Sequence, residues 1–313
     1  MPIYNCLELI KSGLPHVRLW QDLADEIIVV DSFSSDGSLE YLAENLRHPG
    51  LRVIRRPRGL YESWNEGIAA TSGKYVYIST AGDTITREHL LHLIETLESQ
   101  AADAVVSQPI FISDSKEHRW IEGWRTARLL AEMKADSVRM LSKEEACAYS
   151  FMDCPGSLLG SLASDLFLGD FLRKRPFPAE YGRFGDAAWI MRHCAGCRLA
   201  ITSRIGSTFL HHSSETPLTP EGHFLFYRRL ILGERSTLRA AKDLGTFRGR
   251  LRLFVILKLR DRLLWLAKTN CRGERVGLKG LVRTVRTRTT YLAVRISRQL
   301  AMARICWRLR RRG

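Results

Sequence analysis

The chain has 313 residues, of which 45% are hydrophobic, so it is long enough and apolar enough to bury a sizeable core. It contains no apolar run of about 18 residues, and its start lacks the pattern of a signal peptide, so we predict a cytoplasmic protein without a membrane-spanning helix. Residues 248–313 hold 20 Lys and Arg against two acidic residues, a balance of +18, whereas the whole chain carries +15. This asymmetry indicates an anionic partner.

Short apolar runs rich in β-branched residues alternate with helical patterns in the first part of the chain. We predict strands at 26–30, 51–57, 74–80 and 103–112, and helices at 39–46, 63–73 and 86–98. Such alternation predicts an α/β fold with a mostly parallel sheet covered on both faces. Ligands of these sheets bind beyond the carboxyl ends of the strands. Asp31 and Asp83 follow two of those ends, so we expect both near a ligand.

The second part of the chain differs in composition. The stretch 213–223 is rich in Ser, Pro and Thr and reads as a linker, so we divide the chain into a domain at 1–215 and a basic helical region at 216–313. From Leu278 onward the apolar positions that share one helical face are Leu281, Val282, Val285, Leu292, Ile296, Leu300, Ala303 and Trp307. Basic amphipathic helices bind anionic membranes, so we expect peripheral association with the inner face of the membrane. A helical protein partner is the open alternative.

Four segments, in order along the chain, resemble the bacterial-type family-2 glycosyltransferases. They are EIIVVDSFSSDGSLEYL at 26–42, SWNEGIAATSGKYVYISTAGD at 63–83, CPGSLLGS at 154–161 and FPAEYGRFGDAAWIMRH at 178–193. The resemblance covers roughly residues 1–212 and implies the GT-A fold, a Rossmann-like, mostly parallel α/β sheet. It also implies transfer of a sugar, with inversion, from a nucleotide-sugar to a hydroxyl of a glycan or lipid-linked acceptor. Cell-surface polysaccharide or glycolipid synthesis is the expected setting.

The resemblance further implies a role for particular residues. Asp31, Asp36 and Asn65 are expected to bind the nucleotide part of the donor, and Asp186 is expected to act as the general base. Glu180 is the substitute candidate for the base. Asp36 has an equally good structural reading, as a cap on backbone N–H groups of its loop.

Asp83 and His211 are the expected ligands of a divalent cation, Mg²⁺ or Mn²⁺, that bridges the donor diphosphate. The family places an acidic triplet here, in which this chain has Thr80, Ala81 and Gly82 and keeps only Asp83. This departure motivates a second hypothesis, a nucleotide- or glycan-binding protein on the same fold that does not catalyse transfer. A third, nucleic-acid binding through the Arg-rich tail, lacks a recognisable motif, and we expect no specific nucleic-acid partner.

The beginning of the chain departs from the family as well. The segment PIYN at 2–5 resembles the end of the family's first strand, but the apolar run that normally precedes it is missing. We therefore expect either coding sequence upstream of Met1 or a sheet without its usual first strand.

Overall fold

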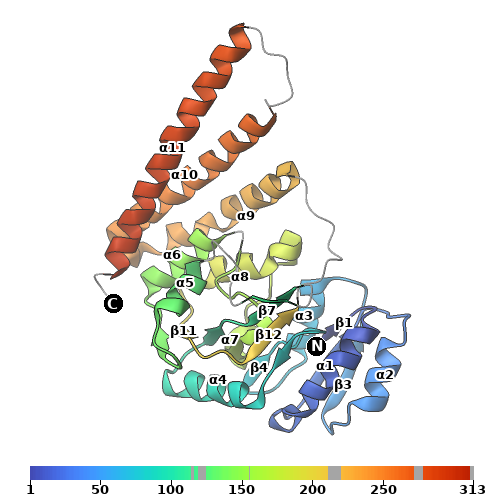
Figure 1. Cartoon of the computed structure of the whole chain (residues 1–313). Helices are drawn as coiled ribbons and strands as arrows, with labels where there is room; N and C mark the ends of the chain where they lie inside the picture. The colour runs from blue at the N-terminus through green and yellow to red at the C-terminus, as the bar shows by residue number, and fades with distance from the viewer. Residues whose placement is uncertain (114–115, 119–124, 155, 211–219, 271–277, 311–313) are drawn as a thin grey trace.

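The computed structural model describes residues 1–113, 116–118, 125–154, 156–210, 220–270 and 278–310. Strands and helices alternate through the first part of the chain, and long helices make up the last part (Figure 1). The fold is α/β, as the sequence predicts. The described helices include none that is long and apolar enough to cross a membrane.

The first sheet is parallel throughout and has the order β1-β2-β3. Its strands are β1 (Pro2–Ile3), β2 (Ile27–Asp31) and β3 (Leu51–Arg55). Every residue of β2 is buried, which explains its unbroken run of branched apolar side chains. Because the strands are parallel, their last residues lie at the same edge of the sheet. These residues are Ile3, Asp31 and Arg55.

Two mixed sheets continue the body. One has the order β4-β10-β6-β11-β9 and the other the order β5-β12-β7-β8. Their strands are β4 (Tyr75–Tyr77), β5 (Thr84–Ile85), β6 (Ala104–Ser107), β7 (Ile110–Ser113), β8 (Lys116–His118), β9 (Val138–Met140), β10 (Leu166–Leu168), β11 (Leu199–Thr202) and β12 (Ser207–Leu210). The single strand predicted at 103–112 is wrong: it is divided into β6 and β7, which belong to different sheets. Gln108 and Pro109 separate them, and proline has no N–H for a strand ladder.

Helices cover the sheets on both faces and form two hydrophobic cores. The helices of the body are α1 (Leu7–Arg18), α2 (Ser38–Asn45), α3 (Leu60–Ala69), α4 (Arg87–Ser99), α5 (Arg125–Glu132), α6 (Lys143–Asp153), α7 (Gly169–Arg173) and α8 (Gly185–His193), with short 3-10 turns at Gln21–Leu23, Leu162–Ser164 and Ala179–Phe184. A further 3-10 turn, Lys242–Leu244, lies in the C-terminal helical region. Successive side chains of β6 point to opposite faces of the sheet and so enter different cores. Val105 lies in the core under α1, α2 and α4, whereas Ala104 and Val106 lie in the core under α3, α6 and α8.

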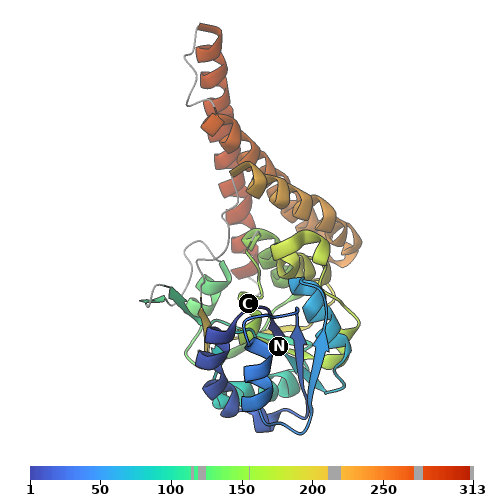
Figure 2. The same cartoon turned by 90° about the vertical axis from the view of Figure 1, so that its right-hand side faces the viewer.

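Three helices follow: α9 (Pro220–Ala240), α10 (Gly245–Asn270) and α11 (Leu278–Arg310). The antiparallel pair α10 and α11 extends away from the body in both views (Figures 1 and 2). At their body end these helices share a core with α8, through Tyr227, Leu230, Phe247 and Ile305. The buried Lys258 of α10 donates to the Met152 carbonyl (2.6 Å) at the end of α6. The basic region is thus packed onto the body.

The first sheet and the sheet that begins with β4 are separated by a gap. A cavity of about 480 Å³ lies between β2 and β4, lined by apolar side chains such as Trp20, Ile28 and Leu166. The Met1 amino group lies in it and donates to the Ile28 carbonyl (2.7 Å), as a strand amide would. Burial lowers the pKa of this amino group to about 5.

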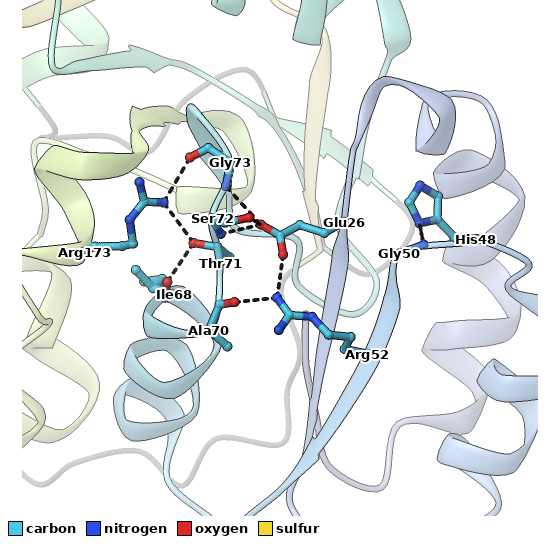
Figure 3. A network of polar contacts seen from close by, with 10 residues as sticks. All are labelled: Glu26, His48, Gly50, Arg52, Ile68, Ala70, Thr71, Ser72, Gly73 and Arg173. Carbon is cyan, nitrogen blue, oxygen red and sulfur yellow. Dashed lines mark hydrogen bonds and ion pairs between the residues drawn. The ribbon is translucent and has the colours of Figure 1, made fainter.

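A polar network joins the two sides of this gap at one end (Figure 3). The Glu26 carboxylate, just before β2, accepts hydrogen bonds from the backbone N–H groups of Ser72 (2.5 Å) and Gly73 (3.0 Å), just before β4. Arg52 of β3 donates to Glu26 (2.5 Å) and to the Ala70 carbonyl at the end of α3. Arg173 of α7 donates to the Gly73 carbonyl (3.0 Å). Side chains therefore connect the two sheets where strand pairing does not.

Candidate active site

The carboxyl edge of the first sheet carries Asp31, whose side chain is fully buried. One carboxylate oxygen accepts from the Ser34 N–H (3.1 Å), and the other accepts from Arg55 Nε (3.2 Å). Asp31 therefore fixes the loop after β2 and orients Arg55. Its predicted contact with a nucleotide stays a prediction.

Two exposed aromatic rings lie near this edge, and one arginine guanidinium lies close to each ring. The Arg55 guanidinium lies 5.8 Å from the centre of the Phe33 ring, and the Arg58 guanidinium lies 4.4 Å from that of Tyr4. Both rings are exposed. An aromatic face beside a guanidinium suits a base next to a phosphate. The sequence reasoning missed these four residues, although clustered arginines in RRPRG at 55–59 were a visible signal.

Asp36 holds the starts of two helices. It accepts from the Leu7 N–H (3.0 Å) at the start of α1 and from the Ser38 N–H (3.0 Å) at the start of α2. Burial opposes ionisation, but a hydrogen bond from the Ser38 hydroxyl (2.5 Å), together with the two N–H groups, outweighs it and lowers the pKa of Asp36. This geometry matches the capping alternative considered from the sequence.

Asn65 is bound at both ends of its amide group. Its oxygen accepts from the Phe177 N–H (2.7 Å) and its nitrogen donates to the Phe177 carbonyl (2.8 Å). Asn65 therefore ties α3 to the segment that leads to Asp186. Such a pair of backbone contacts gives it a positioning role in the described structure, and contact with the donor stays a prediction.

Asp83 lies in the turn between β4 and β5. One oxygen accepts from the Leu210 N–H (2.8 Å) and the other from the Thr80 hydroxyl. Burial raises the pKa of Asp83 to about 6. Its predicted partner His211 follows Leu210 in the sequence but lies outside the described residues. Within the described part of the chain, no group of three His, Cys, Asp or Glu side chains could hold a metal ion, so these residues do not by themselves make a cation site.

Asp186 lies in the first turn of α8. Tyr61 of α3 donates its hydroxyl to an Asp186 oxygen (2.8 Å), and Ser157 also bonds the carboxylate. Burial raises the pKa of Asp186 and outweighs these hydrogen bonds. A carboxylate with a raised pKa is a stronger base than an ordinary aspartate. Glu180, the other candidate for the general base, is exposed, and its carboxylate pairs with Arg192 (3.1 Å).

Gly185 explains why Tyr61 reaches Asp186. A Cβ atom at position 185 would lie 2.5 Å from the Tyr61 ring, so only glycine admits the ring this close. Tyr61 also stacks on Phe177 with ring centres 5.8 Å apart, which fixes the ring from its other side. The sequence reasoning missed Tyr61, which stands two residues before the quoted segment SWNEG.

A second carboxyl group that the sequence reasoning missed, Asp165, lies fully buried just before β10. One oxygen accepts from the Ser107 N–H (3.2 Å), and the other has no hydrogen-bond partner among the described residues. Burial raises the pKa of Asp165 well above its usual value, and the charge of Asp186 raises it further. Only an acidic residue directly before an apolar strand marks it in the sequence.

Two links bring the predicted residues into one region. The first turn of α3 joins the Asp31 loop to Asp186, because Ser63 Oγ lies 3.4 Å from Ser32 Oγ and Tyr61 bonds Asp186. Besides burial, the charges of Asp83 and Asp165 both raise the pKa of the half-buried Tyr77, and the charge of Asp186 raises that of Asp165. The 480 Å³ cavity is not lined by any of the predicted site residues, so cavity size alone does not mark this site.

Comparison with solved structures shows the fold. Two structures of S. aureus TarS 1–349 superpose on the chain at 14% identity, which shows the fold. The one in complex with UDP-GlcNAc gives a TM-score of 0.59 over 94% of this chain and 79% of that chain. The one in complex with UDP gives 0.57 over 91% and 77%. The fold is thus that of the GT-A glycosyltransferases.

Sequence comparisons show similarity to a family model and to one relative. The family model described as glycosyl transferase family 2 matches residues 1–152. The succinoglycan biosynthesis protein ExoO of Rhizobium meliloti (strain 1021) is 26% identical over 129 residues, which are 40% of this chain and 37% of that protein. The match thus spans well under half the length of this relative. Residues 1–152, just under half of this chain, are thus similar to glycosyl transferase family 2.

Proposed function

We propose that this chain transfers a sugar from a nucleotide-sugar to a hydroxyl group of a glycan or lipid-linked acceptor, with inversion at the anomeric carbon. The observation that carries the proposal is the Asp186 carboxylate. It stands at the start of α8, oriented by Tyr61 (2.8 Å), with a pKa that burial raises. A positioned carboxylate of this kind suits removal of a proton from an attacking alcohol.

In the proposed reaction Asp186 takes the proton of the acceptor hydroxyl. The acceptor oxygen then forms a bond to the anomeric carbon, and the bond from that carbon to the donor phosphate oxygen breaks on the opposite face. The nucleoside diphosphate leaves with the electron pair. Tyr61 holds one Asp186 oxygen, so the carboxylate keeps one orientation during the transfer.

The donor nucleotide is proposed to lie along the carboxyl edge of the first sheet. Asp31 and Asp36 shape this edge, and Phe33 and Tyr4 offer exposed rings for a base. Arg55 and Arg58, each above one of these rings, supply positive charge for the diphosphate. The similar TarS structures are complexes with UDP-GlcNAc and with UDP, which supports a nucleotide-sugar donor here.

A divalent cation, Mg²⁺ or Mn²⁺, held by Asp83 and His211 belongs to the proposal as a separate element. If bound, it would offset the charge of the departing diphosphate. Since the described residues do not assemble a cation site, no step above passes through it.

The setting we propose is polysaccharide or glycolipid synthesis on the inner face of a membrane. The name of the relative ExoO refers to succinoglycan biosynthesis, which supports polysaccharide as product. The balance of +18 in residues 248–313 supports attachment to an anionic lipid surface. Attachment there would bring the site to lipid-linked acceptors.

A screen of nucleotide-sugars tests the proposal. Each donor is incubated with the full chain and a mixture of acceptors, and release of nucleoside diphosphate is measured against a heat-denatured control. We expect release from one donor class, and ¹H NMR of the product should show an inverted anomeric centre. Retention of configuration would contradict the proposed role of Asp186.

One observation favours a second candidate, a binding protein on the same fold that does not catalyse transfer. Thr80, Ala81 and Gly82 replace the acidic triplet before Asp83. Both carboxylate oxygens of Asp83 accept hydrogen bonds within the protein. This candidate predicts calorimetric binding of a nucleotide-sugar without release of nucleoside diphosphate under any cation. Release would exclude it.

A further inference from the structure

Helix α11 has two apolar faces rather than one. Val294, Ala301, Ile305 and Leu309 recur at helical spacing and are buried. Leu292, Ile296 and Leu300 recur every four residues and remain more than half exposed, at 57%, 53% and 55%. At about 100° per residue the first set centres on the side opposite the second. The helix therefore packs with one face and presents the other, which we call the outer stripe, to the surroundings.

The arginines of α11 are divided between the same two sides. On the packed side, Arg298 pairs with Asp261 of α10 (2.8 Å) and Arg308 pairs with Glu144 of α6 (3.2 Å). Arg295 and Arg304 flank the outer stripe, are exposed, and make no ion pair with any residue that the structure describes. Internal contacts therefore use the inner arginines, whereas the outer ones are available to an anionic partner.

We propose that the outer stripe of α11 is the surface on which the chain lies on an anionic lipid surface, an inference that rests on the proposed membrane attachment. Leu292, Ile296 and Leu300 insert among the acyl chains, and Arg295 and Arg304 reach the phosphates on either side. Trp307, which is 54% exposed, extends the stripe by two turns with a side chain that favours the membrane interface.

Charge is the reason to commit to lipid. An apolar stripe bounded by cations on both flanks matches a layer that has hydrocarbon below and phosphate above. A second copy of the chain would bring Arg295 and Arg304 against the same two arginines or against the stripe itself, and like charges repel. Since none of the described helices can span a membrane, the contact is a surface contact.

The packing of α11 sets the consequence for the site. Arg308 joins α11 to α6, and α6 runs into the segment that holds Ser157, a hydrogen-bond partner of Asp186. A helix lying flat on lipid would therefore fix the body, and with it Asp186, at one orientation toward acceptors in the membrane.

The test compares two matched triple variants of the full chain in vesicle flotation. One is L292Q/I296Q/L300Q on the outer stripe, and the control is L253Q/I256Q/L263Q on α10, whose three side chains are equally exposed. Net charge and substitution type are the same in both. The vesicles are phosphatidylcholine with and without phosphatidylglycerol, and circular dichroism confirms that each variant stays folded.

We expect the wild-type chain to float with anionic vesicles only, and less as salt rises. The outer-stripe variant should bind at least about tenfold more weakly, whereas the α10 variant should stay within about twofold of wild type. Equal losses in both variants, or a loss in the α10 variant alone, would overturn the inference. So would a wild-type dimer that the outer-stripe variant dissociates in sedimentation.

If the wild type does not bind anionic vesicles, the membrane attachment itself is refuted and the inference falls with it. The assay needs neither donor nor acceptor. Its outcome is therefore independent of whether the chain transfers a sugar.

Discussion

The hydrogen bond from Tyr61 to Asp186 gives the sharpest quantitative prediction. Tyr61→Phe keeps the ring, which packs against Gly185 and Phe177, and removes only the hydroxyl that donates to the carboxylate at 2.8 Å. A hydrogen bond to a charged group contributes about 1.5–3 kcal/mol, and one pKa unit corresponds to about 1.4 kcal/mol. Removing it should therefore raise the pKa of Asp186 by about one to two units.

The assay is a ¹³C NMR titration of aspartate carboxyl groups, with the Asp186 signal assigned by its loss in Asp186→Asn. Tyr75→Phe is the matched control, because its hydroxyl bonds Glu98, which is exposed and distant from Asp186 in sequence and fold. The control should leave the Asp186 titration unchanged. If Tyr61→Phe also leaves it unchanged, Tyr61 does not stabilise the ionised base and the reasoning about the site is refuted.

Three further predictions concern stability and cation binding. Gly185→Ala places a Cβ atom 2.5 Å from the Tyr61 ring, so we expect urea denaturation to show a loss of about 1–3 kcal/mol, and an unchanged midpoint would contradict the packing described. Asp83 has a folded pKa of about 6 against 3.8, so its contribution to stability is present below pH 3.8 and is lost as pH rises through 6. Asp83→Asn should flatten that decline, by about 2 kcal/mol in denaturation curves at the two pH values, and a parallel decline in both proteins would refute the shift. With nucleoside diphosphate present, Mn²⁺ should raise the melting temperature of wild type but not of Asp83→Ala, and an equal rise in both would remove Asp83 as a cation ligand.

Local patterns in the sequence predicted much of the fold. The buried strand β2, the helix at α4 and the long helix from Leu278 follow from residues that are neighbours in the chain, and the structure confirms them. The split of 103–112 into β6 and β7 depends on which sheet each half joins. That pairing is set by residues far away in the sequence, so a local apolar run could not reveal it.

The candidate site was predicted in part. Asp31 lies at the end of a strand as expected, whereas Asp83 lies in a turn directly before β5, because β4 already ends at Tyr77. Tyr61 and Asp165 acquire their importance only through contacts across more than 50 residues. The outer stripe of α11 is a similar case. Leu292 and Ile296 lie on one face as predicted, yet only packing shows that the opposite face, with Val294 and Ile305, meets the rest of the protein.

Turnover by Asp186→Asn, measured with the donor that the nucleotide-sugar screen identifies, tests the central claim most directly. Loss of the base should lower turnover by at least about a hundredfold, while calorimetric affinity for the nucleotide-sugar stays within about threefold of wild type. Glu180→Gln, in which the carboxylate paired with Arg192 is neutralised, should keep turnover near wild type. Turnover by Asp186→Asn equal to that of wild type would contradict the account.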